Sequence, residues 1–331
     1  MKEEKNAGHV PVCFITDNRY ALPTMVAIRS LYLNSRLLKP YRIIVFAAED
    51  LTEDNRRALE QVAPYVKVCP VEPVRTLFPA PSAVQHVSTA ALYKFYLAEI
   101  LKDEDKALYI DSDVLFLRDP EKLLQTELNG AYAAAVESFT APVYLPELLP
   151  NLRVRHYFSS GMMLLNLKRM REENLCEKLV DYRLNGWNCF MDQDALNAVF
   201  HEEVVFLPIE YNLQCTTVTR LKPEEACRRY GVPVAGSWDE VCDRSTILHY
   251  ASSKKPWQYG DIWKAELWLY YYSRLPRRIR EANPLARTAS PKLRQPLGGK
   301  TKRGVKTALK LRHSAQLPLR RVIASLCRGR V

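Results

Sequence analysis

Hydrophobic and polar positions follow two different periods along the first 70 or so residues of the chain. Short apolar runs at 10–16, 42–47 and 66–71 have the length and composition of buried strands. The stretches between them, 20–34 and 52–62, repeat apolar residues every three or four positions, as a helix with one buried face does. Strands that alternate with helices predict an α/β fold with a mainly parallel central sheet covered by helices.

Later apolar runs predict the remaining elements. A proline-rich loop is expected at 70–81. Further strands are expected at 107–110, 132–136, 161–167, 204–209 and 246–250, and further helices at 88–101, 168–184, 193–200 and 261–272. Ligands bind beyond the carboxyl ends of parallel strands, so polar residues directly after these runs are the first candidates for a site.

Charge divides the chain into two parts. Of the net charge of +11, residues 274–331 contribute +16, from 17 Lys and Arg and one acidic residue, which leaves −5 for residues 1–273. Within 305–327 basic residues mix with apolar ones, which predicts basic amphipathic helices that associate with an anionic membrane surface. A solvated tail is the simpler alternative. Nucleic acid is not an expected partner, because this stretch has no aromatic residues for base stacking.

The spacing of the cysteines and the length of the apolar runs indicate a cellular compartment. None of the eight cysteines forms a Cys-x-x-Cys pair, which argues against a zinc site or a redox motif, and a chain of 331 residues does not need a disulfide framework. Residues 1–9 are charged and polar, and no run of 18 apolar residues occurs. We therefore expect a cytoplasmic protein, peripheral on the inner face of the cytoplasmic membrane if the tail binds lipid.

Two aspartates, Asp111 and Asp113, directly follow the apolar run 107–110. Residues two apart project to the same side of an extended chain, so their carboxylates would lie close together and repel each other. A divalent cation held through carboxylate oxygens removes that repulsion. We interpret Asp111 and Asp113 as candidate metal ligands; a polar turn after a strand is the alternative.

His249, near the end of the apolar run 246–250, is the best candidate for a third ligand. A site of carboxylates and an imidazole accepts Mn²⁺ more readily than Ca²⁺ or Mg²⁺. Lys254 and Lys255 follow, and two lysines beside a cation suit a polyanion such as a diphosphate. The alternatives are a core histidine bonded to the backbone and lysines that are merely solvated.

Two polar triplets border other apolar runs. The Asp-Gln-Asp triplet at 192–194 meets the helix expected at 193–200, and an aspartate of the triplet is expected to cap the N-terminus of that helix. The cap explains one carboxylate but not the whole triplet. The Ser-Ser-Gly triplet at 159–161 allows a ligand to approach the backbone closely, with an ordinary turn as the alternative.

Competing motifs fit less well. A calcium-binding EF-hand loop would need a polar residue and a glycine where Leu115 and Phe116 stand. The chain has no Gly-x-Gly-x-x-Gly, Gly-x-x-x-x-Gly-Lys or Gly-x-Ser-x-Gly motif. A phosphohydrolase that uses Asp111 and Asp113 stays open, although such enzymes usually carry the pair after the first strand. A non-catalytic protein that binds membrane or nucleic acid through its basic tail also stays open.

The motifs together resemble retaining glycosyltransferases of family eight, in particular bacterial lipopolysaccharide and lipooligosaccharide galactosyl- and glucosyltransferases. The resemblance covers about three quarters of the chain, from Val10 to Trp257. It implies a GT-A type nucleotide-sugar-binding fold for residues 1–273. The segments that carry it, in matching order and spacing, are Phe14-Ile-Thr-Asp-Asn18, Leu108-Tyr-Ile-Asp-Ser-Asp-Val114, Phe158-Ser-Ser-Gly-Met162 with Asn166-Leu167, Asp192-Gln-Asp-Ala-Leu-Asn197, and His249-Tyr250 with Lys255-Pro-Trp257.

The resemblance also implies ligands and residue roles. It implies Mn²⁺, with Mg²⁺ as the alternative, held by Asp111, Asp113 and His249, a UDP-galactose or UDP-glucose donor, and a saccharide or glycolipid acceptor. Gln193 would lie beneath the anomeric carbon, and Lys255 on the leaving phosphate. The residues implied to bind the donor and its metal are Asp17, Asn18, His86, Lys94, Asp111, Ser112, Asp113, Ser159, Ser160, Asp192, His249, Ser252 and Lys255, and those implied to act in the transfer are Asp192, Gln193 and Lys255.

The chain departs from the family pattern at a few of these positions. Lys94 stands where the family usually has arginine, so a bidentate phosphate contact is lost. Ser159 and Ser160 replace the commoner Asn-Ala, and Ser252 replaces a glycine near the diphosphate. These departures bear on the identity of the sugar more than on the class of reaction.

Sugar transfer develops negative charge on the departing diphosphate and positive charge on the anomeric carbon. The metal and Lys255 would neutralise the first of these charges. Gln193 is an amide, so no aspartate or glutamate nucleophile aligns beneath the sugar. We therefore expect same-face attack by the acceptor hydroxyl, with retention of configuration; a covalent intermediate on Asp192 is the alternative.

Overall fold

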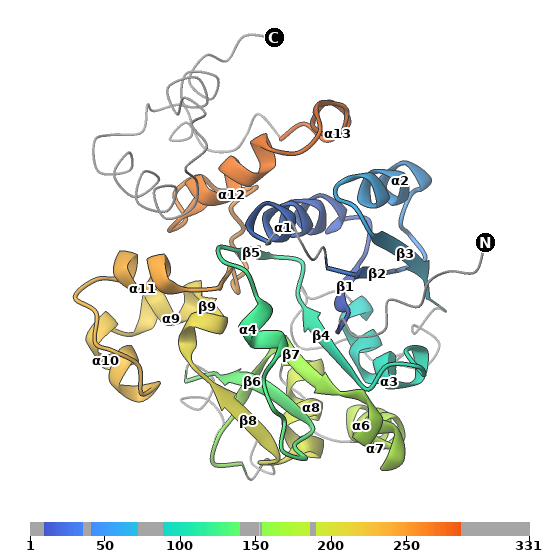
Figure 1. Cartoon of the computed structure of the whole chain (residues 1–331), viewed down its shortest axis with the longest axis vertical. Helices are drawn as coiled ribbons and strands as arrows, with labels where there is room; N and C mark the ends of the chain where they lie inside the picture. Colours follow the sequence, from blue (N-terminus) through green and yellow to red (C-terminus); the bar gives the residue numbers. More distant parts are fainter. Residues whose placement is uncertain are drawn as a thin grey trace.

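The computed structural model describes residues 10–35, 41–71, 89–139, 152, 154–185 and 190–285, and a seven-stranded sheet forms its centre (Figure 1). The strand order is β3-β2-β1-β4-β7-β6-β8. Only β7 in this sheet runs antiparallel to its neighbours β4 and β6, so the predicted α/β fold with a mainly parallel sheet is confirmed. The strands are β1 (Val12–Thr16), β2 (Ile43–Ala47), β3 (Val66–Pro70), β4 (Lys106–Ile110), β6 (Ala133–Glu137), β7 (Phe158–Asn166) and β8 (Val204–Leu207).

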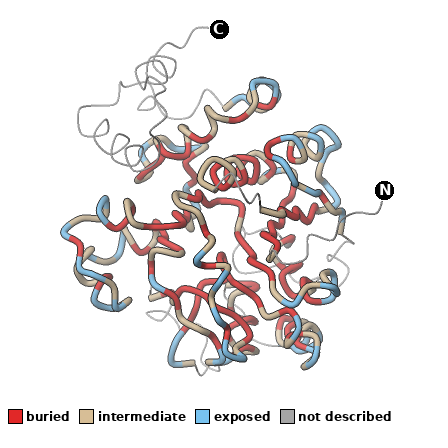
Figure 2. The backbone as a smooth tube through the Cα atoms, viewed as in Figure 1, coloured by how far each residue is buried: buried red, intermediate tan, exposed pale blue. Residues whose placement is uncertain are grey.

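Alternate residues of the strands feed two separate cores, one on each face of the sheet. Val12 and Phe14 of β1 belong to one core, which also includes residues of α1 (Ala21–Asn34), α2 (Glu53–Gln61) and α12 (Ala265–Ser273). Cys13 and Ile15 pack on the other face. That face is covered by η2 (Thr89–Tyr96), α3 (Leu97–Ile100), α6 (Leu167–Glu172), α7 (Leu175–Asn185) and α8 (Asp192–Phe200). The inner strands of the sheet are accordingly buried, the edge strands β3 and β8 are only partly buried, and exposed residues lie mostly at the rim of the molecule (Figure 2).

A second, three-stranded sheet adjoins the first, with the order β5-β10-β9. Its strands are β5 (Val114–Phe116), β10 (Ile247–His249) and β9 (Leu213–Gln214). The chain passes from β4 to β5 through residues 111–113 alone, so the two sheets meet at this link. The remaining helices among the described residues are α4 (Glu121–Leu124), η3 (Ile209–Tyr211), α9 (Cys215–Arg220), α10 (Pro223–Arg229), α11 (Trp238–Arg244) and α13 (Arg277–Ala282).

Two predicted helices differ in the structure. Within the helix expected at 88–101, residues 89–96 form the 3₁₀-helix η2 and residues 97–100 form one turn of α-helix. The segment 168–184 is broken into α6 and α7 at Asn174, whose φ of 53° is a left-handed conformation that asparagine tolerates.

Smaller differences concern where elements begin. The strand expected at 161–167 begins three residues earlier, so Ser159 and Ser160 belong to β7 rather than to a turn before it. The helix expected at 261–272 begins at Ala265, after Lys264 with its left-handed φ of 62°. The short strands β5 and β9 were not predicted.

The beginning of the predicted basic tail packs against the body of the protein. Leu275 and Ile279 are buried in the core beside α1, and Nε of Arg29 donates to the carbonyl of Arg274 at 2.8 Å. The amphipathic stretch at 305–327 lies outside the described residues. Among the residues that the structure does describe, no helix has both the length and the apolar content to cross a lipid bilayer.

Candidate active site

The link between the two sheets carries the two candidate carboxylates. The amide of Asp111 donates to the carbonyl of Gly161 on β7 at 2.9 Å. Ser112 turns inward, and its hydroxyl donates to the carbonyl of Ile15 on β1 at 3.0 Å. Asp113 directly precedes β5. Because Ser112 is anchored, the carboxylates on either side of it are held at the carboxyl end of β4.

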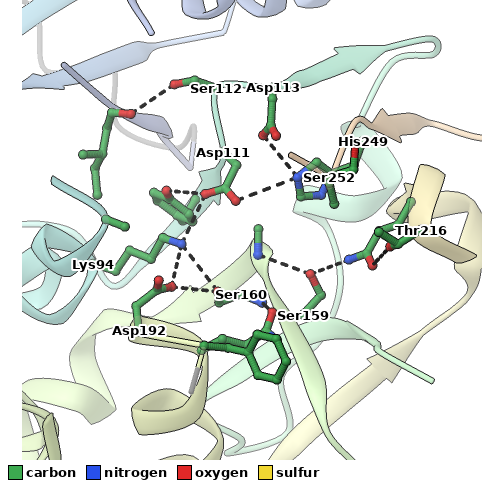
Figure 3. A pocket seen from close by; sticks show the side chains of 18 of the residues that line it. Lys94, Asp111, Ser112, Asp113, Ser159, Ser160, Asp192, Thr216, His249 and Ser252 are labelled. Carbon is green, nitrogen blue, oxygen red and sulfur yellow. Dashed lines mark hydrogen bonds and ion pairs between the residues drawn. The ribbon is translucent and has the colours of Figure 1, made fainter. Parts of the chain in front are cut away.

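His249 completes a group of three possible metal ligands (Figure 3). It ends β10, and its Nε2 lies 3.2 Å from Oδ1 of Asp113 and 3.9 Å from Oδ2 of Asp111. One ligand atom from each residue lies within 4.8 Å of the other two. The structure thus brings together the three residues that the sequence predicted as ligands.

Two buried lysines balance the charge of these carboxylates. Nζ of Lys255 donates to Oδ2 of Asp113, and Nζ of Lys94 lies 3.2 Å from Oδ1 of Asp111. Burial opposes the ionisation of Asp113, but Lys255 and His249 outweigh it and hold the pKa of Asp113 well below its usual range. Burial also opposes the charge of the lysines, yet nearby carboxylates raise the pKa of both Lys94 and Lys255. These pKa shifts favour the charged forms of Asp113, Lys94 and Lys255.

Asp192 belongs to the same network. Of the two aspartates of the triplet expected to cap α8, Asp194 accepts from the amide of Phe190 at 2.6 Å just before the helix, and Asp192 does not act as a cap. It is the first residue of α8, Met191 occupies the cap position with a φ of 51°, and no side-chain cap bond forms there. Oδ2 of Asp192 instead accepts from Nζ of Lys94 and from Oγ of Ser160, both at 2.7 Å. The buried ammonium needs a carboxylate partner, which explains why the side chain points into the site.

Gln193 and Ser159 are also held by hydrogen bonds. Oε1 of Gln193 accepts from the amide of Ser160 at 3.1 Å, and its Nε2 donates to the hydroxyl of Tyr157 at 3.2 Å. Oγ of Ser159 accepts from Nε2 of Gln214 at 2.6 Å. These bonds orient both side chains independently of any ligand.

Of the two residues predicted to bind the nucleotide, one lines the cavity and the other faces a neighbouring loop. Asp17, at the carboxyl end of β1, lines the cavity, and its Oδ1 accepts from the amide of Tyr20 at 2.9 Å. Asn18 faces the loop after β2, where its Oδ1 accepts from the amide of Thr52 at 3.2 Å and from Nδ2 of Asn55 at 2.8 Å. Asn18 therefore organises the start of α2, and its side chain does not border the cavity.

A single cavity of about 470 Å³ is formed by these residues. The predicted site residues that line it are Asp17, Lys94, Asp111, Ser112, Asp113, Ser159, Ser160, Asp192, Gln193, His249, Ser252 and Lys255. His86 lies outside the described residues. Lining residues that the sequence did not suggest include Tyr20, Tyr109, Ser138, Phe190, Gln214, Thr216 and Arg220. Gln214 ends a strand of two residues, which is too short to show a periodicity.

Removing the ammonium of Lys94 is expected to destabilise the fold. In Lys94→Met, the carboxylate of Asp192 would stay buried without its cation, and breaking a buried ion pair in this way costs about 3–5 kcal/mol. Urea unfolding measures the change in free energy. The control is Lys168→Met, whose ammonium lies 4.0 Å from Glu172 on an exposed surface and should contribute less than about 1 kcal/mol. Equal losses in both variants would contradict the buried network.

Comparison with known proteins identifies the family. A family model described as glycosyl transferase family 8 matches residues 11–261 of this chain. The chain belongs to glycosyl transferase family 8. The match includes both sheets and every described residue that lines the cavity.

Curated relatives match parts of this chain at about 30% identity. General stress protein A of Bacillus subtilis (strain 168) is 29% identical over 181 residues, which are 52% of this chain and 60% of that protein. Lipopolysaccharide 1,2-glucosyltransferase of Escherichia coli (strain K12) is 32% identical over 163 residues, which are 46% of this chain and 44% of that protein. The alignments thus span about half the length of these relatives.

Solved structures establish the fold class. The galactosyltransferase LgtC, solved with donor and acceptor sugar analogues, superposes with a TM-score of 0.69 at 23% identity, over 82% of this chain and 99% of LgtC. The bifunctional glycosyltransferase WbbM superposes with a TM-score of 0.68 at 22% identity, over 83% of this chain and 51% of WbbM. The predicted GT-A type fold is confirmed.

Proposed function

We propose that this protein is a metal-dependent, retaining glycosyltransferase that moves galactose or glucose from a UDP-sugar to a hydroxyl of a lipopolysaccharide-type or other saccharide acceptor. The observation that carries the proposal is the gathering of a carboxylate–imidazole triad, the buried Lys255 and the Asp192–Gln193 pair around one cavity. The names of the lipopolysaccharide glucosyltransferase and of the galactosyltransferase LgtC support this class of donor and acceptor.

The residues present fit a divalent cation. Asp111, Asp113 and His249 offer two carboxylates and one imidazole within a small volume, a donor set that suits Mn²⁺. Gly161 lies so close to the imidazole of His249 and to Oδ2 of Asp111 that a Cβ at this position would collide with both. When bound, such an ion stabilises the charge of a departing diphosphate by several kcal/mol.

Beside the metal, three side chains of the protein have proposed roles in the transfer. Lys255 would place a fixed positive charge beside the leaving phosphate. Gln193 has no carboxylate to attack the anomeric carbon, and Oδ2 of Asp192 is already bonded to Lys94 and Ser160. We therefore favour same-face attack by the acceptor hydroxyl over a covalent intermediate on Asp192. Mass spectrometry with donor present and acceptor withheld detects a glycosyl adduct on Asp192 if the covalent route operates.

We also propose that the tail at 274–331 binds the membrane surface. Its net charge of +16 would favour an anionic bilayer, at about 1 kcal/mol per basic residue near the surface. Binding there would bring a cytoplasmic enzyme to the inner face of the membrane, where a growing glycolipid acceptor is accessible.

Thermal unfolding with candidate donors tests the proposed activity. UDP-galactose or UDP-glucose at 100 times its Kd should add about 2.7 kcal/mol of stability, but only when Mn²⁺ is present. UDP release with saccharide acceptors then identifies the sugar, and NMR of the product reports the anomeric configuration. Phosphatase turnover without sugar transfer would favour a phosphohydrolase instead, and an inverted product would contradict the retaining mechanism.

A further inference from the structure

The imidazole of His249 has two ring nitrogens, and they face different partners. Nε2 lies 3.2 Å from Oδ1 of Asp113, whereas Nδ1 lies 3.0 Å from Oδ1 of Asn212. A neutral imidazole carries its proton on one nitrogen and offers a lone pair on the other. A metal between His249 and Asp113 requires the lone pair on Nε2, so the proton must stay on Nδ1.

Asn212 is placed to hold the proton there. Its Oδ1 only accepts hydrogen bonds, so the 3.0 Å contact forms a bond when Nδ1 of His249 carries a proton. Asn212 is 1% exposed and His249 is 3% exposed, so water does not compete for this contact. The alternative of a histidine bonded to the backbone does not describe this arrangement.

The side-chain amide of Asn212 is itself oriented by its surroundings. Nδ2 donates to Oγ of Ser159 at 3.3 Å, and the same Oγ accepts from Nε2 of Gln214 at 2.6 Å. With Nδ2 bonded to Ser159, Oδ1 is the atom left to face His249. Ser159 thus connects the wall of the cavity to the far side of the imidazole.

The backbone holds both residues in the same small sheet. Asn212 lies directly before β9, and its amide donates to the carbonyl of Ile209 at 3.0 Å. β9 pairs in parallel with β10, with Gln214 opposite His249. The contact between Asn212 and His249 therefore joins two hydrogen-bonded segments, which keeps its geometry precise.

We propose that Asn212 is a positioning residue that keeps the proton of His249 on Nδ1 and so presents Nε2 to a divalent cation. The inference rests on the proposed function, because it requires the site of Asp111, Asp113 and His249 to bind a metal. Asn212 does not line the cavity, so it acts on the site through the two side chains that it contacts, His249 and Ser159.

Calorimetric titration of the metal-free full chain with Mn²⁺, without donor, tests the proposal. Asn212→Ala is expected to weaken Mn²⁺ binding by about 10- to 100-fold, the range for removing such a partner. Asn212→Asp keeps an acceptor oxygen and is expected to bind Mn²⁺ at least as tightly as the wild type. Asn166→Ala is the matched control, since its side chain bonds the carbonyl of Ala131 and the amide of Arg169 instead. It should leave Mn²⁺ binding unchanged.

A second measurement does not depend on how the variants fold. In wild-type protein with ¹⁵N-labelled histidine and no metal, the chemical shift of Nδ1 of His249 is expected to be that of a protonated nitrogen. An unprotonated Nδ1 would overturn the proposal. Equal Mn²⁺ affinity in Asn212→Ala and the wild type would also overturn it. So would Mn²⁺ binding by Asn212→Asp that is as weak as that expected of Asn212→Ala. A wild type that binds no Mn²⁺ would overturn the proposed metal site itself, so the two failures are distinguishable.

Discussion

Replacing Asp113 with asparagine is expected to lower kcat/KM for sugar transfer by at least roughly 1000-fold. The carboxylate of Asp113 contacts both His249 and Lys255, so it is central to the proposed metal site. Asparagine keeps the size of the side chain but removes the charge that attracts the ion. Lewis-acid assistance is worth several kcal/mol, and about 1.4 kcal/mol corresponds to a tenfold change in rate. UDP release measures the loss, and calorimetry should show a parallel loss of Mn²⁺ binding.

Asp103→Asn is the matched control for this variant. It removes the same charge from an exposed position before β4 and should leave transfer unchanged. Because Asp113 also neutralises the buried Lys255, circular dichroism must show that the Asp113 variant is folded. If it is not, Asp111→Asn serves instead, since 29% of the Asp111 side chain is exposed. Undiminished transfer by a folded variant of either aspartate would contradict the metal role.

Gly161→Ala is expected to lower transfer by about 100-fold, because a methyl group at this position displaces two of the proposed ligands. The added Cβ would lie 2.4 Å from Cε1 of His249 and 2.8 Å from Oδ2 of Asp111. The imidazole cannot move aside easily, since Asn212 and Asp113 hold both of its nitrogens. A displacement of about 1 Å at a reacting site can reduce the rate 100-fold.

Measurements of stability and of Mn²⁺ binding distinguish displacement of the proposed ligands from a general loss of folded protein. Overpacking of this kind costs about 1–3 kcal/mol of unfolding free energy, which urea titration measures. Gly236→Ala is the control, because its nearest atom beyond the neighbouring residues, Oε1 of Glu240, lies at 3.9 Å. Wild-type Mn²⁺ affinity in the Gly161 variant would show that the ligands tolerate the methyl group.

Local signals were sufficient for much of the fold. The helix expected at 52–62 is α2, whose start is set by Thr52, since its side chain accepts from the amide of Asn55. The helix expected at 20–34 is α1 to within one residue. The strand-end position of Asp111 and Asp113 likewise depends only on the apolar run before them.

Features that depend on contacts between residues far apart in the sequence could not be predicted from the sequence pattern. Lys94 and Asp192 are 98 positions apart, so no local pattern around Asp192 indicates their ion pair. The reversed direction of β7 depends on which strands it pairs with, and its apolar run reads the same in either direction. Asn212 lies in no motif, and only the pairing of β9 with β10 brings it to His249.

The link between the two sheets, residues 111–113, is also expected to influence the order in which the nascent chain folds. Lys255 follows Asp113 by 142 positions, and β10 with His249 is made only shortly before it. While the ribosome has produced only β1 to β5, Asp113 has neither partner, and burying an unpaired carboxylate is strongly unfavourable. The nascent chain is therefore expected to keep 111–113 in contact with water until β10 arrives. Completion of the fold and formation of the proposed donor pocket are then expected in the same step.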